Sequence, residues 1–258
     1  MRPALLNPLF APVRSLSGIG PKLAPLFDRL LAPQGQDARL IDVLLHLPRS
    51  VVDRRLNINL NDGNTGETGT YEVRVLAHKP SPPGRARIPY RVFTEDDVDE
   101  LTLVFFSAQR ARVEAMLPIG SLRYVSGKIE LFDNRKQMVH PDRILDAEAY
   151  AKLPPFEPVY GLTAGLYPRV FQKATQAALL KMPELREWSD PLLVQREKWP
   201  AFADALKSLH SPKSKEELAP ESLARIRLAY DELFAGQVAL DRKSTRLNSS
   251  HANISYAV

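Results

Sequence analysis

Two adjacent phenylalanines, Phe105 and Phe106, are the first residues of the sequence that could contact a ligand, in the segment LTLVFFSAQ. The alternation of this segment predicts a β-strand, in which neighbouring side chains point to opposite faces. Leu101, Leu103 and Phe105 then form an apolar face suited to a core, which leaves Phe106 outside, near the end of the strand. An exposed ring can stack on a nucleic-acid base, but a following helix or a neighbouring domain can also cover it.

Basic side chains surround this strand in the sequence, whereas acidic ones cluster in the segment EDDVDE, residues 95–100. Basic charge that is separated from acidic charge and lies next to an aromatic residue favours contact with the backbone of a single strand. The alternative is a solvated charged face without a partner. The basic set comprises Arg85, Arg87, Arg91, Arg110, Arg112, Arg123, Lys128, Arg135 and Lys136.

A second candidate contact lies in the segment SGIGPKLAPLF, residues 17–27. Gly18 and Gly20 permit a tight turn whose backbone N–H groups converge at a helix start, where a phosphate can bind. This arrangement resembles the hairpin of a helix-hairpin-helix element, and Lys22 would lie close to the phosphate. The alternative is a helix-entry turn that only packs.

Catalytic and metal-binding patterns are weak or missing. Around Gly127-Lys128, a phosphate-binding loop fails at two required positions, which are occupied by Leu122 and Ile129. Asp231-Glu232 lies in an expected helix, so a solvated face explains it better than a metal site. The histidines lie on different expected elements without metal-ligand spacing, and we expect His140 and His210 to end elements. We therefore expect no catalytic residue, metal site or cofactor in this chain.

Composition is that of an ordinary globular protein, with 44% hydrophobic and 25% charged residues among 258. No apolar run approaches the ~18 residues that would span a bilayer. Prolines interrupt the N-terminal segment, which argues against a secretory signal there. The absence of cysteine fits a reducing compartment, and we expect a cytoplasmic, monomeric protein. The net charge of +5 and the pI of about 9.4 favour an anionic partner.

Periodicity divides the chain into four expected regions. Residues 1–60 are helical, and residues 61–150 contain three strands, one helix and two strands. This order matches a five-stranded barrel of the OB type, so the expected fold class is α+β. Residues 151–241 form a helical connector with helices at 167–182, 199–212 and 220–240, the last with an apolar stripe. Residues 242–258 lose that stripe and resemble a translated adapter sequence, so we expect a non-native tail on a truncated gene product. The stripe of the last helix comprises Leu223, Ile226, Tyr230, Leu233 and Phe234.

Several of these segments together resemble the RecG family of ATP-dependent DNA helicases, in order from residue 14 to about 240. They are SGIGPKLA, DVLLHLPRSVVDRR, LTLVFFSAQ, LPIGSLRYVSGKIE, QMVHPDR, FEPVYGLTAGL, ALKSLHSP and ARIRLAYDELFAGQVAL. The resemblance implies that residues 61–150 form an OB-type wedge domain that splits strands at a DNA branch. It also implies remodelling of stalled replication forks and Holliday junctions in repair and recombination.

Carried onto this sequence, the family's base-stacking role falls first on Phe106 and second on Phe105. The other expected DNA contacts are Arg123, Lys128, Arg110, Arg91 and Lys22. The resemblance assigns ATP and magnesium to motor domains that follow the connector, so this chain should bind branched or single-stranded DNA without hydrolysing ATP alone. A different possibility is that the barrel is a protein-interaction module that does not bind nucleic acid.

Overall fold

The computed structural model describes residues 3–254 except residues 34, 58, 63–64 and 83–87. Arg85 and Arg87 of the basic set therefore lie outside the described residues. The chain divides into two compact units, which we call the helical unit (Met1–Val51 with Pro158–Val258) and the sheet unit (Val52–Glu157). Both α-helices and a β-sheet are present, so the α+β class is confirmed.

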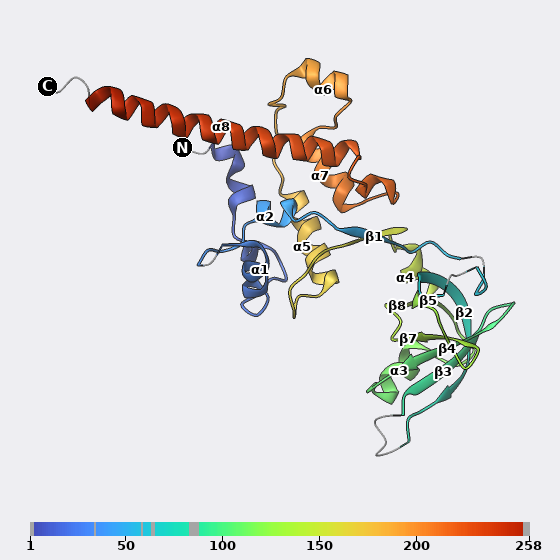
Figure 1. Ribbon diagram of the computed structural model, residues 1–258. Coiled ribbons are helices and arrows are strands. Elements are labelled where there is room, and N and C mark those ends of the chain that lie inside the picture. The colour runs from blue at the N-terminus through green and yellow to red at the C-terminus, as the bar shows by residue number, and fades with distance from the viewer. Residues whose placement is uncertain (1–2, 34, 58, 63–64, 83–87, 255–258) are drawn as a thin grey trace. The chain divides into compact units, whose positions relative to one another are not determined.

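The helical unit is built from elements at both ends of the sequence (Figure 1). Its α-helices are α1 (Ala24–Leu31), α2 (Leu40–Leu45), α5 (Pro168–Leu180), α6 (Pro191–Glu197), α7 (Phe202–His210) and α8 (Leu223–Ile254). Three short 3-10 helices complete it: η1 (Ala4–Phe10), η2 (Val13–Ser15) and η3 (Glu216–Leu218). None of the helices in the described residues is both long and apolar enough to cross a membrane.

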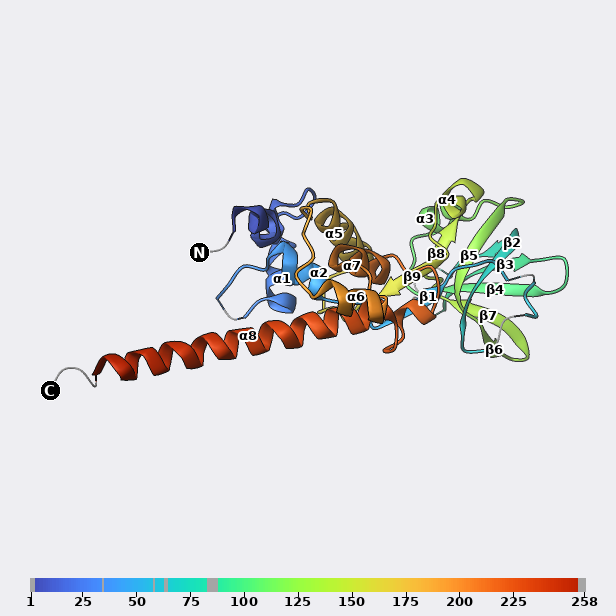
Figure 2. The same ribbon diagram turned by 90° about the horizontal axis from the view of Figure 1, so that it is seen from above.

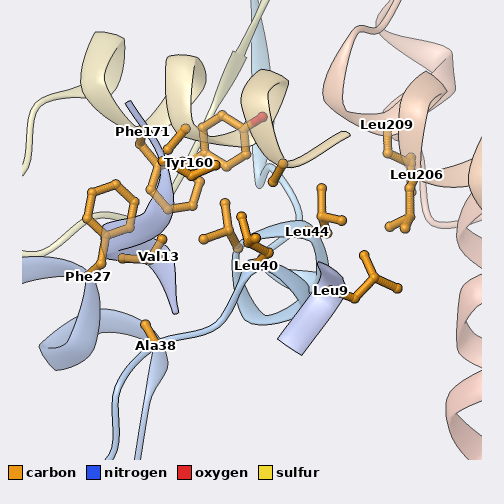
Figure 3. Packing of buried hydrophobic residues seen from close by; sticks show 14 of the residues in the cluster. Leu9, Val13, Phe27, Ala38, Leu40, Leu44, Tyr160, Phe171, Leu206 and Leu209 are labelled. Atoms are coloured by element: carbon orange, nitrogen blue, oxygen red, sulfur yellow. The ribbon is translucent and has the colours of Figure 1, made fainter. Parts of the chain in front are cut away.

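One hydrophobic cluster joins the N-terminal helices to the helices that follow the sheet unit. The rings of Phe27 in α1 and Phe171 in α5 stack with centroids 5.6 Å apart, and Figure 3 shows them beside the α2 leucines Leu40 and Leu44. All four side chains are 0% exposed. The apolar spacing that predicts these helices thus marks residues that pack on one another, although the sequence places them about 140 positions apart.

The longest helix departs from the sequence prediction in its end and in its buried face. α8 continues to Ile254, through most of the expected tail, because no proline or glycine follows Gly236 to interrupt it. The expected apolar stripe is largely exposed: Leu233 is 72% and Leu223 48% exposed. The buried positions are instead Ala224, Arg227, Leu228 and Asp231, of which two are charged. The origin of the tail stays a prediction.

The sheet unit contains a seven-stranded sheet in the order β6-β7-β4-β3-β2-β5-β8 (Figure 2). Its strands are β2 (Thr68–Lys79), β3 (Tyr90–Glu95), β4 (Glu100–Phe105), β5 (Leu122–Lys128), β6 (Glu130–Phe132), β7 (Arg135–Val139) and β8 (Arg143–Leu145). The helix α3 (Arg110–Met116) lies between β4 and β5, and α4 (Ala147–Ala151) follows β8. The strands β1 (Ser50–Asp53) and β9 (Phe156–Val159) pair separately, where the chain enters and leaves this unit.

The sheet has more strands than the five expected because two expected strands are interrupted. Ile129, which is 1% exposed, separates β5 from β6. The segment QMVHPDRI is broken at His140, whose φ of +47° is left-handed, and at Pro141, which has no N–H to pair. A pairing that closes the sheet into a barrel is not found among the strand ladders of the described residues.

A buried ion cluster fixes the entry and exit of the sheet unit. Arg54 is 6% exposed and donates from Nε to the Glu157 carboxylate at 2.9 Å and from Nη1 to Ser126 Oγ at 2.7 Å. Glu157 also accepts a hydrogen bond from Arg143 in β8. A buried charge is tolerated only when it is paired, so removing any one of these partners would destabilise the unit.

Candidate nucleic-acid interface

The two phenylalanines at the end of β4 have the opposite placements that alternation predicts. Phe105 is 7% exposed and packs in the sheet-unit core with Leu101 and Leu103, whereas Phe106 is 45% exposed. The strand ends here because Ser107 adopts a left-handed φ of +55°, which no extended strand continues. The buried Phe105 ring offers little surface to a base, which favours its structural role over its expected role in stacking.

Phe106 is held by His140, a residue that sequence reasoning did not connect to it. The Phe106 N–H donates to His140 Nε2 at 3.3 Å, and the two ring centroids lie 5.9 Å apart. The His140 N–H donates to the Val104 carbonyl at 2.9 Å. The only sequence signal was the His-Pro dipeptide, which marks the end of β7 but not the contact with β4.

The outer face of the sheet places one expected basic contact beside this end of β4. Arg91 in β3 pairs with Val104, so both side chains lie on the face away from the core. Phe93, which is half-buried, lies on the same face two residues along β3. Val104 is only 3% exposed, although alternation predicts it outside, so this face of β4 is covered at that position.

Arg110 begins α3, four residues after Phe106, and its side chain is 69% exposed. Its Nε donates to the Glu114 carboxylate at 2.8 Å, and this hydrogen bond raises the pKa of Arg110. Burial, followed by the charge of Glu114, raises the pKa of Tyr90, the residue that pairs with Phe105. Arg110 therefore lies near the same strand end as Phe106, partly neutralised by Glu114.

The remaining expected contacts have other surroundings. Arg123 donates from Nε to the Met116 carbonyl at 3.0 Å, so it satisfies the last turn of α3. Lys128 is exposed at the end of β5, a strand that is not adjacent to β4. Lys22 is exposed in the helical unit, beside a turn in which Gly18 has a φ of +85°. The predicted tight turn is confirmed, and its phosphate contact stays a prediction.

The acidic segment 95–100 lies at the opposite end of β4 and neutralises one more residue of the basic set. Asp99 pairs with Lys136 Nζ at 2.9 Å, so this lysine is neutralised rather than available to phosphate. The neighbouring β6–β7 hairpin presents Leu131 and Phe132, which are 54% and 55% exposed. Sequence reasoning missed Phe132 as an exposed aromatic, although the Asp-Asn turn that follows it was visible.

Asp231 was expected on a solvated face and is instead 9% exposed. It accepts from Arg227 Nε at 2.8 Å and from Trp188 Nε1 at 2.9 Å. Arg227 is 0% exposed and donates two further bonds of 2.8 Å to Glu187, which lower the pKa of that carboxyl to about 2. The cluster is a structural ion network, and no group of metal-ligating side chains is found among the described residues.

Comparison with known proteins supports the resemblance noted in the sequence. The chain matches no family model. It is 26% identical to the ATP-dependent DNA helicase RecG of Aquifex aeolicus over 224 residues, and 26% identical to that of Bacillus subtilis over 243 residues. The chain is related to the RecG family. These matches cover 82% and 91% of the chain but 28% and 33% of the two RecG helicases.

A solved structure of RecG bound to a three-way DNA junction matches the fold with a TM-score of 0.69 and 21% identity. The match covers 92% of this chain and 32% of that RecG chain. At this identity the likeness establishes the fold. The chain therefore spans about a third of the RecG proteins it matches, and their activity as whole proteins is not transferred by fold alone.

Proposed function

We propose that this chain is the DNA-binding part of a RecG-type helicase, and that its sheet unit contacts DNA at a branch. One observation supports this above the others: Phe106 is 45% exposed and held at the end of a strand with Arg91 and Arg110 nearby. Base stacking on such a ring contributes ~1–3 kcal/mol per base, and flanking arginines attract the phosphate backbone.

The sheet unit supports a barrel of the OB type, which we include in the proposal. β5 and β6 stand near opposite ends of the sheet order, yet a single residue joins them, so they can act as one bent strand that closes the sheet. A Cβ atom on Gly127 would lie 2.7 Å from Met138 Sδ, which means that β5 passes very close to β7. The parallel pairing of β4 with β7 and the helix between β4 and β5 also fit this fold.

The wider role follows from the family and belongs to the same proposal. Whole RecG-type proteins would remodel stalled forks and Holliday junctions in the cytoplasm, in repair and recombination. ATP and magnesium would bind in motor domains outside the 258 residues, and the chain would act as a monomer. In this layout residues 1–60 form an N-terminal helical region, residues 61–150 the wedge domain, and residues 151–241 a helical connector toward the motor domains.

The test compares binding of a labelled three-way junction with binding of a duplex of the same length. Phe106→Ala should weaken junction binding by ~1–3 kcal/mol, roughly 5- to 150-fold. Phe132→Ala is the matched control, because Phe132 is 55% exposed but lies on the hairpin beside the acidic segment. Equal loss in both variants, or equal binding of junction and duplex by the unaltered chain, would contradict the proposal.

Salt dependence tests the electrostatic part. Arg91→Ala should lower the slope of log K against log salt by about 0.7–0.9, the contribution of one phosphate contact. Arg123→Ala should change this slope less, because Arg123 is engaged with the carbonyls of Met116 and Leu122. If both variants give the unaltered slope, neither Arg91 nor Arg123 contacts phosphate.

The second candidate is a protein-interaction module, which the β6–β7 hairpin favours. Leu131 and Phe132 are exposed there, near the acidic segment 95–100, and that end of the sheet is poorly suited to DNA. This candidate predicts that junction binding is absent, and that Phe132→Ala rather than Phe106→Ala weakens binding to a protein partner.

A further inference from the structure

We infer that His140 is a positioning residue for Phe106, which holds the exposed ring in place for the DNA contact. The inference rests on the proposed function, because it concerns the same end of β4. Two contacts and one backbone feature support it: a hydrogen bond to the backbone of Phe106, a ring contact with its side chain, and a left-handed backbone at His140 itself.

The hydrogen bond joins His140 to the backbone of Phe106. The donor is the Phe106 N–H and the acceptor is His140 Nε2, at 3.3 Å. β4 ends at Phe105, so the ladder with β3 no longer fixes the next residue. The imidazole therefore accepts the hydrogen bond that a neighbouring strand would otherwise accept, at the residue whose exposed ring is proposed to contact DNA.

The ring contacts restrict the side chain as well as the backbone. The His140 ring lies edge-on to Phe105, with centroids 6.3 Å apart and an interplanar angle of 88°. It also lies 5.9 Å from the Phe106 ring at 42°. His140 thus bridges a buried ring and an exposed one, and limits the orientations that the exposed ring can adopt.

The backbone of His140 is fixed in an uncommon conformation. Its φ is +47°, a region that non-glycine residues rarely adopt, and its N–H is bonded to the Val104 carbonyl at 2.9 Å. Pro141 follows and fixes its own φ. Strained residues of this kind persist where the surrounding structure holds them, and they cluster at functional sites. A ring that is already fixed loses less conformational entropy when it binds, which raises affinity without a new contact.

The test is a double-mutant cycle on the full 258-residue chain, with a labelled three-way junction as the probe. His140→Gly keeps the left-handed backbone accessible but removes the acceptor and the ring. It should weaken junction binding by roughly 2- to 12-fold, because DNA binding would then have to order the Phe106 side chain. In a Phe106→Ala background the same change should weaken binding by less than about 2-fold, because there is no ring left to position.

Other outcomes of the cycle are decisive. The same loss in both backgrounds would overturn the inference, since His140 would then act on DNA or on the fold directly. Loss with Phe106→Ala but none with His140→Gly would overturn the inference and leave the proposed function intact. If Phe106→Ala itself has no effect, the proposed role of Phe106 fails instead.

A spectroscopic measurement tests the positioning without DNA. The amide proton of Phe106 should shift and exchange faster in His140→Gly, and also in His140→Asn, which tolerates the left-handed backbone but lacks the ring. The asparagine variant serves if the glycine variant folds poorly. An unchanged Phe106 amide in both variants would overturn the inference whatever the binding data show.

Discussion

His210 makes the stability of the helical unit depend on pH in a way that can be worked out from its contacts. The side chain is 1% exposed at the end of α7. Its Nε2–H donates to the Leu44 carbonyl at 2.8 Å, and its Nδ1 accepts from the Tyr160 hydroxyl at 2.9 Å. Both nitrogens of the neutral ring are therefore satisfied, and burial lowers the pKa of His210 from 6.5 to about 4.

The sign follows from proton linkage. Because the folded-state pKa lies below the unfolded value, the unfolded chain binds the proton first as the pH falls. The stabilisation from neutral His210 is complete above about pH 6.5 and is lost progressively as the pH falls from 6.5 to about 4. The difference between the two pKa values, 6.5 and about 4, corresponds at about 1.4 kcal/mol per unit to roughly 3–4 kcal/mol when His210 is fully protonated.

The assay is urea unfolding followed by tryptophan fluorescence, at several pH values between 7.5 and 4. Both tryptophans of the chain, Trp188 and Trp199, lie in the helical unit, so the signal reports that unit alone. The comparison is with His210→Gln, which keeps hydrogen-bonding atoms but does not titrate. The stability difference between the two proteins should change by about 3 kcal/mol over this range. A difference that stays constant within about 1 kcal/mol would refute a buried neutral histidine.

Three further variants test packing and pairing. Glu187→Gln should destabilise the helical unit by about 1–3 kcal/mol at pH 7, less than for a fully buried ion pair because the Glu187 side chain is 31% exposed. The loss should shrink as the pH falls from about 4.5 toward 2, which urea unfolding followed by fluorescence would measure. Gly127→Ala should destabilise the sheet unit by about 1–3 kcal/mol in thermal unfolding, because the new methyl group meets buried Met138. Phe105→Ala should destabilise that unit by about 3–5 kcal/mol in the same assay; a cost below 1 kcal/mol would contradict its place in the core.

Local periodicity predicted the elements that are regular and amphipathic. The alternation of the segment that forms β4 identified Leu101, Leu103 and Phe105 as core residues, and all three are buried. The helical period of residues 1–60 and 151–241 likewise predicted the helices of the helical unit. These predictions succeed because a half-buried strand or helix repeats its apolar residues with the period of its own backbone.

Contacts between distant segments could not be predicted in the same way. α8 buries Arg227 and Asp231 because Glu187 and Trp188, some 40 residues earlier, supply their partners. When these partners are not known, a charged pair at i and i+4 indicates a solvated face, and the apolar residues beside it are predicted to be the buried stripe. The spacing of apolar residues in the sequence therefore predicted the wrong buried face for α8.

Exposure alone does not identify the candidate site, as the two exposed phenylalanines of the sheet unit show. Phe106 is 45% and Phe132 55% exposed, so exposed area alone would favour Phe132 as the residue that stacks on a base. Their surroundings differ: Phe106 lies near arginines and is held by His140, whereas Phe132 lies on a hairpin beside the acidic segment. A phosphate backbone would be attracted more strongly at the first place, because Arg135, which pairs with Phe132, is offset by the acidic segment. The assignment to Phe106 therefore depends on charge and on a contact 34 residues away in sequence, neither of which the alternation of β4 alone specifies.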